Sequence, residues 1–437
     1  MKVCKLSDIA EVQTGPFGSQ LHSEDYVEEG TPIVTVEHLG NRRFTIQNLP
    51  FVSNEDRERL SKYSLREGDI VFSRVGAVDR CSYVTSDENG WLFSGRCLRV
   101  RCHHECDALY LYYYFCSDSV KEYVRSKAVG ATMLSLNTDL MLEIPIQFPQ
   151  IKLQKEIAKT LSFLDSKIEL NRQINDNLEA MAKQLYDYWF VQFDFPNEEG
   201  KPYKSSGGAM VYNEKLKREI PQGWHCYELN KWLEIKSGFA FKSETYISKG
   251  KFKVVTIKNV QDHHLDTSSC DYVYEIPQGM KKWCSLSVND RLISLTGNCG
   301  RLCIVTEKDL LLNQRVGLLA CNDEYIDYAY LLLSSEEYQT LSNNLAKGAA
   351  QANLSPVDLC KNIAVLPKLD VLEKFNRQIK PIVASYIQNE IQIAELTKQR
   401  DELLPLLMNG QASVNYHLSS FPHRSFGHSY APKSTRL

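Results

Sequence analysis

The sequence lacks the motifs that mark most nucleotide-using enzymes. It has no GxxxxGKS or GxxxxGKT loop to hold a nucleoside triphosphate, and no GxGxxG loop to hold a dinucleotide or a similar cofactor. The Asn-Pro-Pro-Tyr type of tetrapeptide, which amino-methyltransferases use against a flipped base, is also missing. No Ser/His/Asp, Cys/His or paired-carboxylate set occurs at a recognisable spacing. We therefore expect a binding protein that has no catalytic residues and no cofactor of its own.

Long apolar runs and an excess of positive charge are missing as well. No run approaches the roughly 18–20 apolar residues that a membrane-spanning helix needs, and the start, MKVCKLSDIAEV, has no signal-peptide core. We therefore expect a cytoplasmic protein with no membrane partner. The net charge is −3, whereas proteins that coat nucleic acid non-specifically are usually basic. Contact with nucleic acid would need local patches of charge.

The 13 cysteines are odd in number and irregularly spaced, which favours reduced thiols over a disulfide framework. Two cysteine clusters could suggest a metal: Cys102-His103-His104-Glu105-Cys106, and Cys299 with Cys303. Neither has a second ligand pair at zinc-finger spacing. We therefore expect no metal site.

What the sequence does contain is a long internal repeat. SLREGDIVFSRVGAVDRCSYVT, from Ser64, and SLSVNDRLISLTGNCGRLCIVT, from Ser285, are identical at eight of 22 positions at an offset of 221 in the numbering. Further along, GATMLSLNTDLMLEIPIQFP from Gly130 resembles GAAQANLSPVDLCKNIAVLP from Gly348 at an offset of 218. The repeated unit of about 200 residues is far longer than a solenoid repeat. It predicts a tandem duplication of a whole domain.

The first part of each repeat is rich in short β-like runs. Residues 33–36, 70–72 and 292–294 read as strands, the last two following a Gly-Asp or Asn-Asp turn. A helical run at 108–115, rich in tyrosine, recurs at 328–333. We expect its aromatic residues to pack as a helix face, with base stacking as the alternative.

The second part of each repeat is a long helix with an apolar stripe at heptad spacing. The stripe in the first repeat and its counterpart at an offset of 218 are Ile157, Leu161, Leu164, Ile168, Asn171, Leu178, Leu185 and Phe375, Ile379, Ile382, Tyr386, Asn389, Leu396, Leu403. Every position is apolar in both copies except one, which is asparagine in both. Pro381 should kink or restart the second helix.

Two such helices in one chain are expected to pair as an antiparallel coiled coil. Asn171 lies near the centre of the first helix, so we expect Asn171 and Asn389 to face each other and fix the register, as one buried polar pair does in coiled coils. The alternative is that both asparagines lie at the wet edge of the seam.

This layout resembles the specificity (S) subunit of type I restriction-modification enzymes over residues 1 to about 411. The resemblance rests on GDIVFSRVG from Gly68, LYDYWFVQFDFP from Leu185, EIPQGW from Glu219 and LLPLLMNGQ from Leu403. It implies an α+β protein: two tandem β-rich target-recognition domains, each followed by a long helix. The expected boundaries are 1–150 and 225–367 for the two domains, 151–196 and 368–410 for the helices, 197–224 for a polar linker, and 411–437 for a disordered tail.

The resemblance also implies partners. Each domain would read one half of a split sequence in double-stranded DNA, and the helices would fix the spacer between the halves. The helices would also dock two methyltransferase subunits, and motor-nuclease subunits would join them. S-adenosylmethionine and ATP would then be bound by partner subunits and not by this chain.

Sequence readout in DNA grooves favours Arg, Lys, Asn and Gln, and the repeat places such residues in comparable loops. The candidates in the first repeat are Arg42, Arg43, Arg74, Arg80, Lys127 and Thr132; those in the second are Lys258, Asn259, Asn298, Arg301, Lys347 and Gln351. Because copies that read different sequences should differ at base-reading positions, the matched pair Arg80 and Arg301 suits a phosphate contact or a structural salt bridge better.

Two other functions stay open. A free-standing modification enzyme would need a cofactor site that no motif reveals. A structural adaptor would bind proteins through the two domains and use the helices as a strut. Salt dependence would separate an adaptor from a DNA reader, because binding to DNA weakens steeply as the salt concentration rises.

Overall fold

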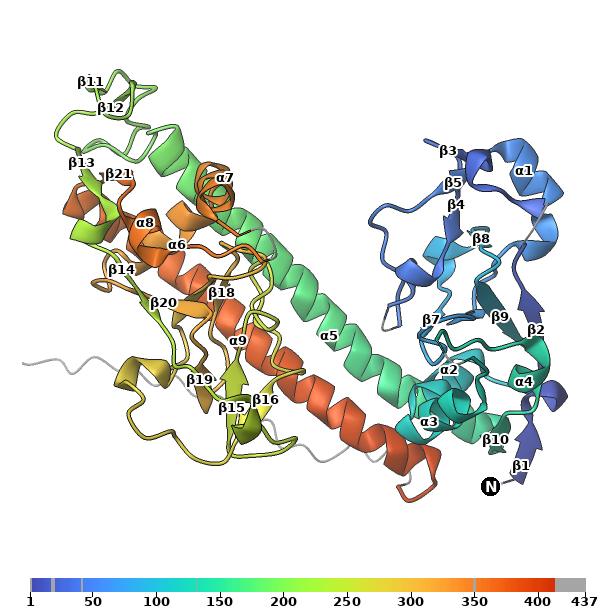
Figure 1. Ribbon diagram of the computed structural model, residues 1–437. Helices are drawn as coiled ribbons and strands as arrows, with labels where there is room; N and C mark the ends of the chain where they lie inside the picture. Colours follow the sequence, from blue (N-terminus) through green and yellow to red (C-terminus); the bar gives the residue numbers. More distant parts are fainter. Residues whose placement is uncertain (1, 17–19, 41, 131, 349–350, 413–437) are drawn as a thin grey trace, which may run out of the picture. The chain divides into compact units, whose positions relative to one another are not determined.

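The computed structural model describes residues 2–16, 20–40, 42–130, 132–348 and 351–412 (Figure 1). By their contacts these residues form two compact units. The first unit contains the described residues up to 166 together with 397–412, and the second contains those from 167 to 396. Each long helix contributes to both units, because the boundaries fall inside the helices.

Among the described residues of the first unit, the strands form three small sheets. The central sheet has four antiparallel strands in the order β2-β9-β6-β7, and a second sheet has the order β3-β5-β4-β8 with β4 and β8 parallel. β1 pairs with β10. The strands are β1 Lys2–Lys5, β2 Ala10–Thr14, β3 Tyr26–Val27, β4 Thr31–Val34, β5 Phe51–Val52, β6 Ile70–Ser73, β7 Cys81–Tyr83, β8 Leu92–Phe93, β9 Cys97–Cys102 and β10 Pro145–Phe148.

The second unit repeats this pairing in its main strands. Its four-stranded sheet has the order β14-β20-β17-β18, β15 and β19 are parallel, and β13 pairs with β21. The strands are β13 His225–Glu228, β14 Glu234–Ser237, β15 Phe252–Val255, β16 Asp271–Val273, β17 Arg291–Ser294, β18 Leu302–Ile304, β19 Leu310–Leu312, β20 Val316–Ala320 and β21 Ile363–Leu366. The duplication predicted from sequence is therefore a duplication of fold.

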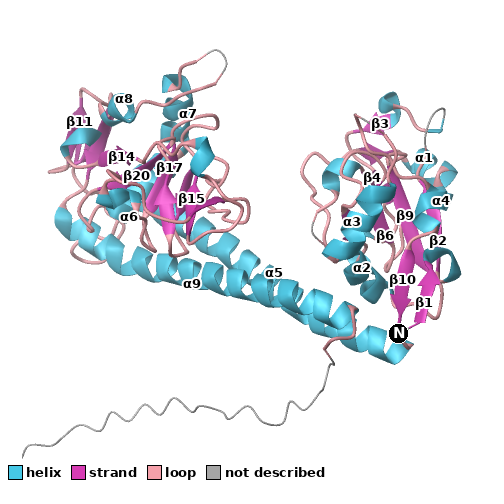
Figure 2. Ribbon diagram, turned by 60° about the horizontal axis from the view of Figure 1, so that its bottom comes forward, coloured by secondary structure: helices cyan, strands magenta, loops and turns pink. Residues whose placement is uncertain are grey.

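The helices, drawn in cyan in Figure 2, occur in the same order in both repeats. α2, α3 and α4 of the first unit correspond to α6, α7 and α8 of the second, and α5 corresponds to α9. The helices are α1 Asn54–Arg59, α2 Ala108–Cys116, α3 Asp118–Lys127, α4 Thr138–Leu142, α5 Ile151–Tyr186, α6 Ile326–Ser334, α7 Glu336–Leu345, α8 Pro356–Cys360 and α9 Leu369–Met408. After α5 the chain continues as a π-helix, Asp187–Val191.

Turn chemistry explains why both copies fold alike before β6 and β17. Gly68 has φ +91°, and its counterpart Asn289 has φ +81°. Asparagine is one of the few residues other than glycine that adopts this left-handed conformation readily. The substitution therefore preserves the tight turn that starts each central strand.

The tyrosine-rich helix α2 is a packed helix, as expected. Its residues from Tyr110 to Phe115 are all buried. The Tyr110 hydroxyl donates to the carbonyl of Gln147 at 2.8 Å, and the matching Tyr328 hydroxyl of α6 donates to the carbonyl of Val365. These aromatic side chains are committed to the two cores and are not available to stack on bases.

The apolar stripes of α5 and α9 also pack. None of the fourteen stripe residues is exposed. In the second unit the two helices run side by side in opposite directions (Figures 1 and 2), with Trp189 against Phe375 at 5.6 Å between ring centroids. α9 continues without a break through Pro381, so the expected restart is not found. The neighbouring Ile379 and Tyr386 are buried, and their packing outweighs the hydrogen bond that proline cannot donate.

The segment predicted to be a polar linker is folded. Met210–Asn213 (β11) and Arg218–Pro221 (β12) form a hairpin. The aromatic residues on either side pack into the core of the second unit, with Phe195 stacked on Trp224 at 4.9 Å between ring centroids. The polar residues between them obscure these anchors in the sequence. Most of the predicted tail, from residue 413, lies outside the described residues.

No helix in the described part of the chain combines the length and the apolarity needed to cross a membrane.

Candidate nucleic-acid interface

In the first unit, two candidate loops are joined at one place. The loop that follows β6 and the loop that follows α3 are linked because the Gly76 amide donates to the carbonyl of Leu134 and the Leu136 amide donates to the carbonyl of Arg74, both at 2.8 Å. Asp79, in the loop after β6, also forms an ion pair at 2.9 Å with Arg125 on α3. The two loops, which carry Arg74, Arg80 and Thr132, are therefore brought together beside Lys127 at the end of α3.

The second unit joins the corresponding loops in the same way. The Gly297 amide donates to the carbonyl of Ala352 at 2.9 Å, and the Leu354 amide donates to the carbonyl of Leu295 at 2.8 Å. The Gln339 side chain of α7 donates to the carbonyl of Gly300 at 2.9 Å. The loops that carry Asn298, Arg301, Lys347 and Gln351 thus form one surface, as do their counterparts in the first unit.

Most of the candidate side chains are exposed, both on the joined loops and on the loops that follow β4 and β15. The exposed ones are Arg43, Arg80, Lys127, Thr132, Lys258, Asn298, Lys347 and Gln351. Arg74 is half-buried, and its guanidinium donates to the carbonyl of Gly95 at 3.3 Å. Exposed polar residues on rigid loops are the arrangement that groove readout requires.

Asn259 requires a correction, because it is a structural residue. It is 1% exposed, and its Oδ1 accepts hydrogen bonds from the amide and hydroxyl of Thr256 at 2.8 and 2.9 Å. Its Nδ2 donates to the carbonyl of Asp266 at 2.9 Å. With its amide occupied inside the loop, Asn259 is not available to a base.

The first repeat performs the same task with a residue that sequence analysis overlooked. Nδ1 of His38, which is 3% exposed, lies 3.2 Å from the Thr35 amide and 2.9 Å from the Thr35 hydroxyl. Thr35 and Thr256, like His38 and Asn259, are equivalent at the offset of 221. The shared Val-Thr strand end and offset could have pointed to this pair, but the change from histidine to asparagine obscured it.

Arg42 is also corrected: it faces helix α5 and not open solvent. Its Nη1 lies 3.6 Å from Oδ2 of Asp165 and 3.4 Å from the Ser162 carbonyl, and its side chain is 23% exposed. Arg301 is held similarly, with Nε 3.2 Å from Asp262 and Nη1 3.1 Å from Gln261. Of the two roles expected for Arg301, these contacts match the structural salt bridge.

The adjacent residues Lys258 and Asn259 provide a test of these assignments. We expect Asn259→Ala to lower the free energy of unfolding by about 1–3 kcal/mol, because it leaves buried partners unsatisfied. Lys258→Ala should leave stability within about 0.5 kcal/mol and should weaken binding to the specific DNA sequence by about 1–3 kcal/mol, the expectation for loss of a base contact. Urea unfolding and binding titrations at several salt concentrations measure both. An equal loss of stability in the two variants would contradict the assignment of Asn259 as structural and Lys258 as available for binding.

The two helix asparagines lie where the helices meet, but each has another partner. The Asn389 side chain donates to Oδ1 of Asn175 at 3.1 Å, and the Asn171 side chain donates to Gln392 at 3.2 Å. The predicted polar contact is thus displaced by about one helical turn. The Asn175 side chain also donates to Glu390 at 2.7 Å, a residue that the heptad pattern does not distinguish.

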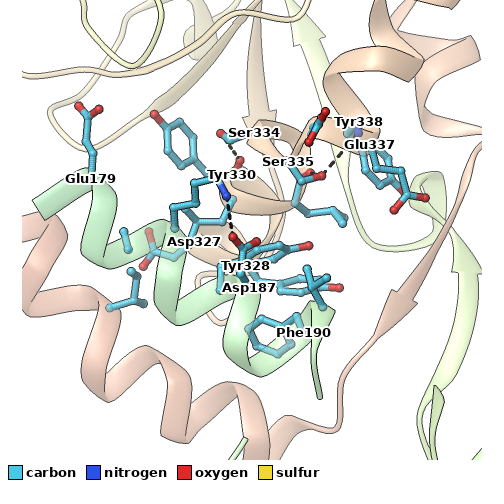
Figure 3. A pocket seen from close by; sticks show the side chains of 18 of the residues that line it. Glu179, Asp187, Phe190, Asp327, Tyr328, Tyr330, Ser334, Ser335, Glu337 and Tyr338 are labelled. Atoms are coloured by element: carbon cyan, nitrogen blue, oxygen red, sulfur yellow. Dashed lines mark hydrogen bonds and ion pairs between the residues drawn. The ribbon is translucent and has the colours of Figure 1, made fainter. Parts of the chain in front are cut away.

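A cavity of about 670 Å³ lies within the second unit, between α5, α6, α7 and α9 (Figure 3). Two of its tyrosine hydroxyls are committed: Tyr328 and Tyr338 donate to the carbonyls of Val365 and Ile363. Asp327 is paired with Arg291. Burial raises the pKa of Glu179, on the cavity wall, to about 7, with smaller contributions from Asp176 and Glu390. These groups form no nucleophile–base pair.

The cysteine clusters offer no metal centre in the part of the chain that the structure describes. No group of three or more His, Cys, Asp or Glu side chains there is arranged to hold a metal ion. Cys102 and Cys106 lie 3.2 Å apart between sulfur atoms, and the hydrogen bond to Cys102 together with burial raises the pKa of the Cys106 thiol.

Comparison with known proteins agrees with this geometry. Residues 1–180 and 221–400 match the family described as "Type I restriction modification DNA specificity domain". The chain is 29% identical over 429 residues to the type I restriction enzyme MjaIX specificity subunit of Methanocaldococcus jannaschii, covering 94% of this chain and 93% of that protein. It is 22% identical over 415 residues to the HindI specificity subunit of Haemophilus influenzae, covering 82% and 90%.

Among solved structures, the S subunit of a type I restriction-modification system from M. genitalium is similar in fold. The TM-score is 0.55 at 16% sequence identity, and the match covers 93% of this chain and 95% of that one. The two matched segments of the family lie one in each repeat and cover most of the sequence. The chain therefore belongs to the type I restriction-modification DNA specificity family.

Proposed function

We propose that this chain reads a split DNA sequence for a type I restriction-modification complex, one half-site with each repeat. The observation that carries the proposal is the same pair of joined loops in both units, with different exposed side chains. At the offset of 218, Lys347 and Gln351 in the second unit stand where the first unit has Val129 and Met133, all four of them exposed. A shared framework with variable polar side chains suits two readers of two different sequences.

The readers proposed for bases are the exposed residues that differ between the repeats: Arg43, Thr132, Lys258, Asn298 and Gln351. Arg80, Lys127 and Lys347 are proposed to contact phosphates. Arg80 has an arginine, Arg301, at the equivalent position, and Lys127 and Lys347 are exposed cations beside the joined loops. Residues 1–150 and 225–367 are the proposed target-recognition domains.

The two helices, 151–196 and 368–410, are proposed to act as the ruler between half-sites. Their opposed directions in the second unit and the buried stripes support an antiparallel coiled coil. α5 has 36 residues, which at 1.5 Å per residue is about 54 Å. A rigid rod of this length can hold two recognition surfaces at a fixed separation.

Two methyltransferase subunits, and motor-nuclease subunits with them, are the proposed protein partners. Large apolar side chains stay exposed on α5, including Leu170 at 56% and Met181 at 53%. Exposed apolar patches on a helix mark protein contacts. In this proposal the chain is not catalytic, and S-adenosylmethionine and ATP bind to the partner subunits.

A base-resolution map of N6-methyladenine tests the proposal. A host that carries this chain with its methyltransferase partner should show methylation at one split motif, and the motif should vanish when only this chain is removed. If the map does not change, DNA-binding titrations at several salt concentrations decide the matter. Weak binding that is insensitive to salt would favour a protein adaptor and overturn the proposal.

A further inference from the structure

In the first unit, one carboxylate on α5 ties together three separate elements. Asp165, whose side chain is 9% exposed, accepts a hydrogen bond from the Tyr113 hydroxyl of α2 at 2.5 Å. It accepts another from Nη1 of Arg400, on α9, at 3.0 Å, and Arg42, in the loop between β4 and β5, lies 3.6 Å away. Burial by itself would lower the pKa of Arg400, but its bonds to Asp165 and Asp401 raise it.

The second unit has a similar arrangement around a carboxylate on α9. Glu390, whose side chain is 11% exposed, accepts a hydrogen bond from Nδ2 of Asn175 on α5 at 2.7 Å. Its other oxygen lies 3.2 Å from Nδ1 of His264. One turn earlier on α9, the Tyr386 hydroxyl donates to the carbonyl of His263 at 2.8 Å.

The loops held by the two carboxylates are equivalent in the repeat. Arg42 and His263 correspond at the offset of 221, and both adopt a left-handed backbone, with φ +73° and +62°. Each loop also pairs with the fourth strand of the central sheet, through the bridges Arg42–Ser82 and His263–Cys303. The first loop carries the exposed candidate Arg43, and the second loop carries Lys258.

We propose that Asp165 and Glu390 are positioning residues, each fixing a DNA-facing loop against the helix pair and so setting the spacer length that the complex accepts. This inference rests on the proposed function. Successive base pairs are about 3.4 Å apart along the DNA axis. A recognition loop must therefore be held to better than that distance if the complex is to reject a spacer one base pair too long or too short.

The two carboxylates are suited to that task because each is buried and has several donors. A neutral amide in place of Asp165 cannot accept from Tyr113, Arg42 and Arg400 together, since one of its two polar atoms is a donor. Hydrogen bonds to charged groups are also the stronger ones. Loss of the charge should release the loop while the apolar core, which does not include the two carboxylates, stays packed.

The experiment compares N6-methyladenine maps of Asp165→Asn and Glu390→Gln with those of the unchanged chain, each in complex with the methyltransferase partner. We expect both half-site sequences to be retained. Methylation at spacers one base pair longer or shorter should rise about tenfold relative to the correct spacer, in line with the loss of one hydrogen bond to a charged group. Glu402→Gln is the control, because Glu402 is an exposed α9 carboxylate whose contact with Lys398 is a distant one at 3.9 Å.

Two loop-side variants keep the test decisive if a helix variant fails to fold. Arg42→Lys and His264→Gln leave the helices unchanged and should also relax the spacer. A changed half-site sequence with Arg42→Lys would instead mean that Arg42 reads a base, and it would overturn the inference. An unchanged spacer in all folded variants would overturn it too. Failure of the underlying function is distinguishable, because the complex with the unchanged chain would then methylate no split motif.

Discussion

Replacing Asp327 by alanine is expected to lower the free energy of unfolding of the second unit by about 3–5 kcal/mol, the cost of breaking a buried ion pair. Arg291 is 1% and Asp327 is 4% exposed, and Nη2 of Arg291 donates to Oδ1 of Asp327 at 2.6 Å. Without Asp327 the guanidinium would stay buried with only Asn289 to accept its protons. A charge held in the core without its counter-ion accounts for the size of the effect.

The first repeat supplies the matched control for this substitution. At the position of Arg291 it has Ile70, and at the position of Asp327 it has Leu109, by the offsets of 221 and 218. The double variant Arg291→Ile, Asp327→Leu should therefore keep most of the stability, because apolar residues often replace a buried ion pair without loss. Urea unfolding followed by circular dichroism measures all three proteins. An Asp327→Ala variant within about 1 kcal/mol of the unchanged chain would contradict the assignment.

The stability of the second unit is expected to fall as pH rises from about 5 to 8, because of Glu179. Burial, with Asp176 and Glu390 nearby, raises the pKa of this carboxyl to about 7, well above the usual value of about 4.3. The folded protein therefore keeps a proton that the unfolded chain has already lost. The stabilisation is complete below the unfolded pKa and is lost as pH rises through the folded one.

His264 acts in the same direction. Its hydrogen bond to Glu390 raises the pKa of the imidazole, so its contribution is present at low pH and disappears as pH rises through the folded value. Above that value His264 no longer supplies a positive charge beside Glu390. The remaining charged groups that act on the site are Asp176 and Arg172 on α5 and Asp266 in the loop.

The variant Glu179→Gln isolates this effect. Its stability relative to the unchanged chain should increase by about 2 kcal/mol between pH 5 and pH 8, a figure reduced for the partial solvent access of the site. Urea unfolding at four pH values measures the difference. Glu336→Gln, at the exposed rim of the same cavity, should leave the pH profile unchanged. Parallel profiles for Glu179→Gln and the unchanged chain would show that Glu179 does not retain its proton.

The existence and type of most elements could be predicted from local sequence. The heptad stripes correctly indicated two long helices, and the runs at 70–72 and 292–294 became β6 and β17. These features depend on periodicity and on neighbouring residues, which the sequence displays directly. The folded hairpin of β11 and β12 was missed because Phe195 and Trp224, which anchor its ends, lie far apart in a polar stretch.

Within the candidate interface, residue type could not separate structural side chains from available ones. Lys258 and Asn259 are adjacent and both polar, yet one is exposed and the other is 1% exposed. The difference arises because the loop folds back so that Asp266 and Thr256 both contact Asn259. Such a closed turn depends on the whole loop, so the identity of a single residue does not reveal it.

The sequence by itself determined the duplication, the two long helices and the family, because each rests on patterns repeated along the chain. Tertiary structure alone decided which polar residues meet. It moved the asparagine contact by one turn, turned Arg42 toward Asp165 and placed His264 beside Glu390. The physical reason is that these partners lie far apart along the chain, so their contacts follow from how whole elements pack and not from local spacing.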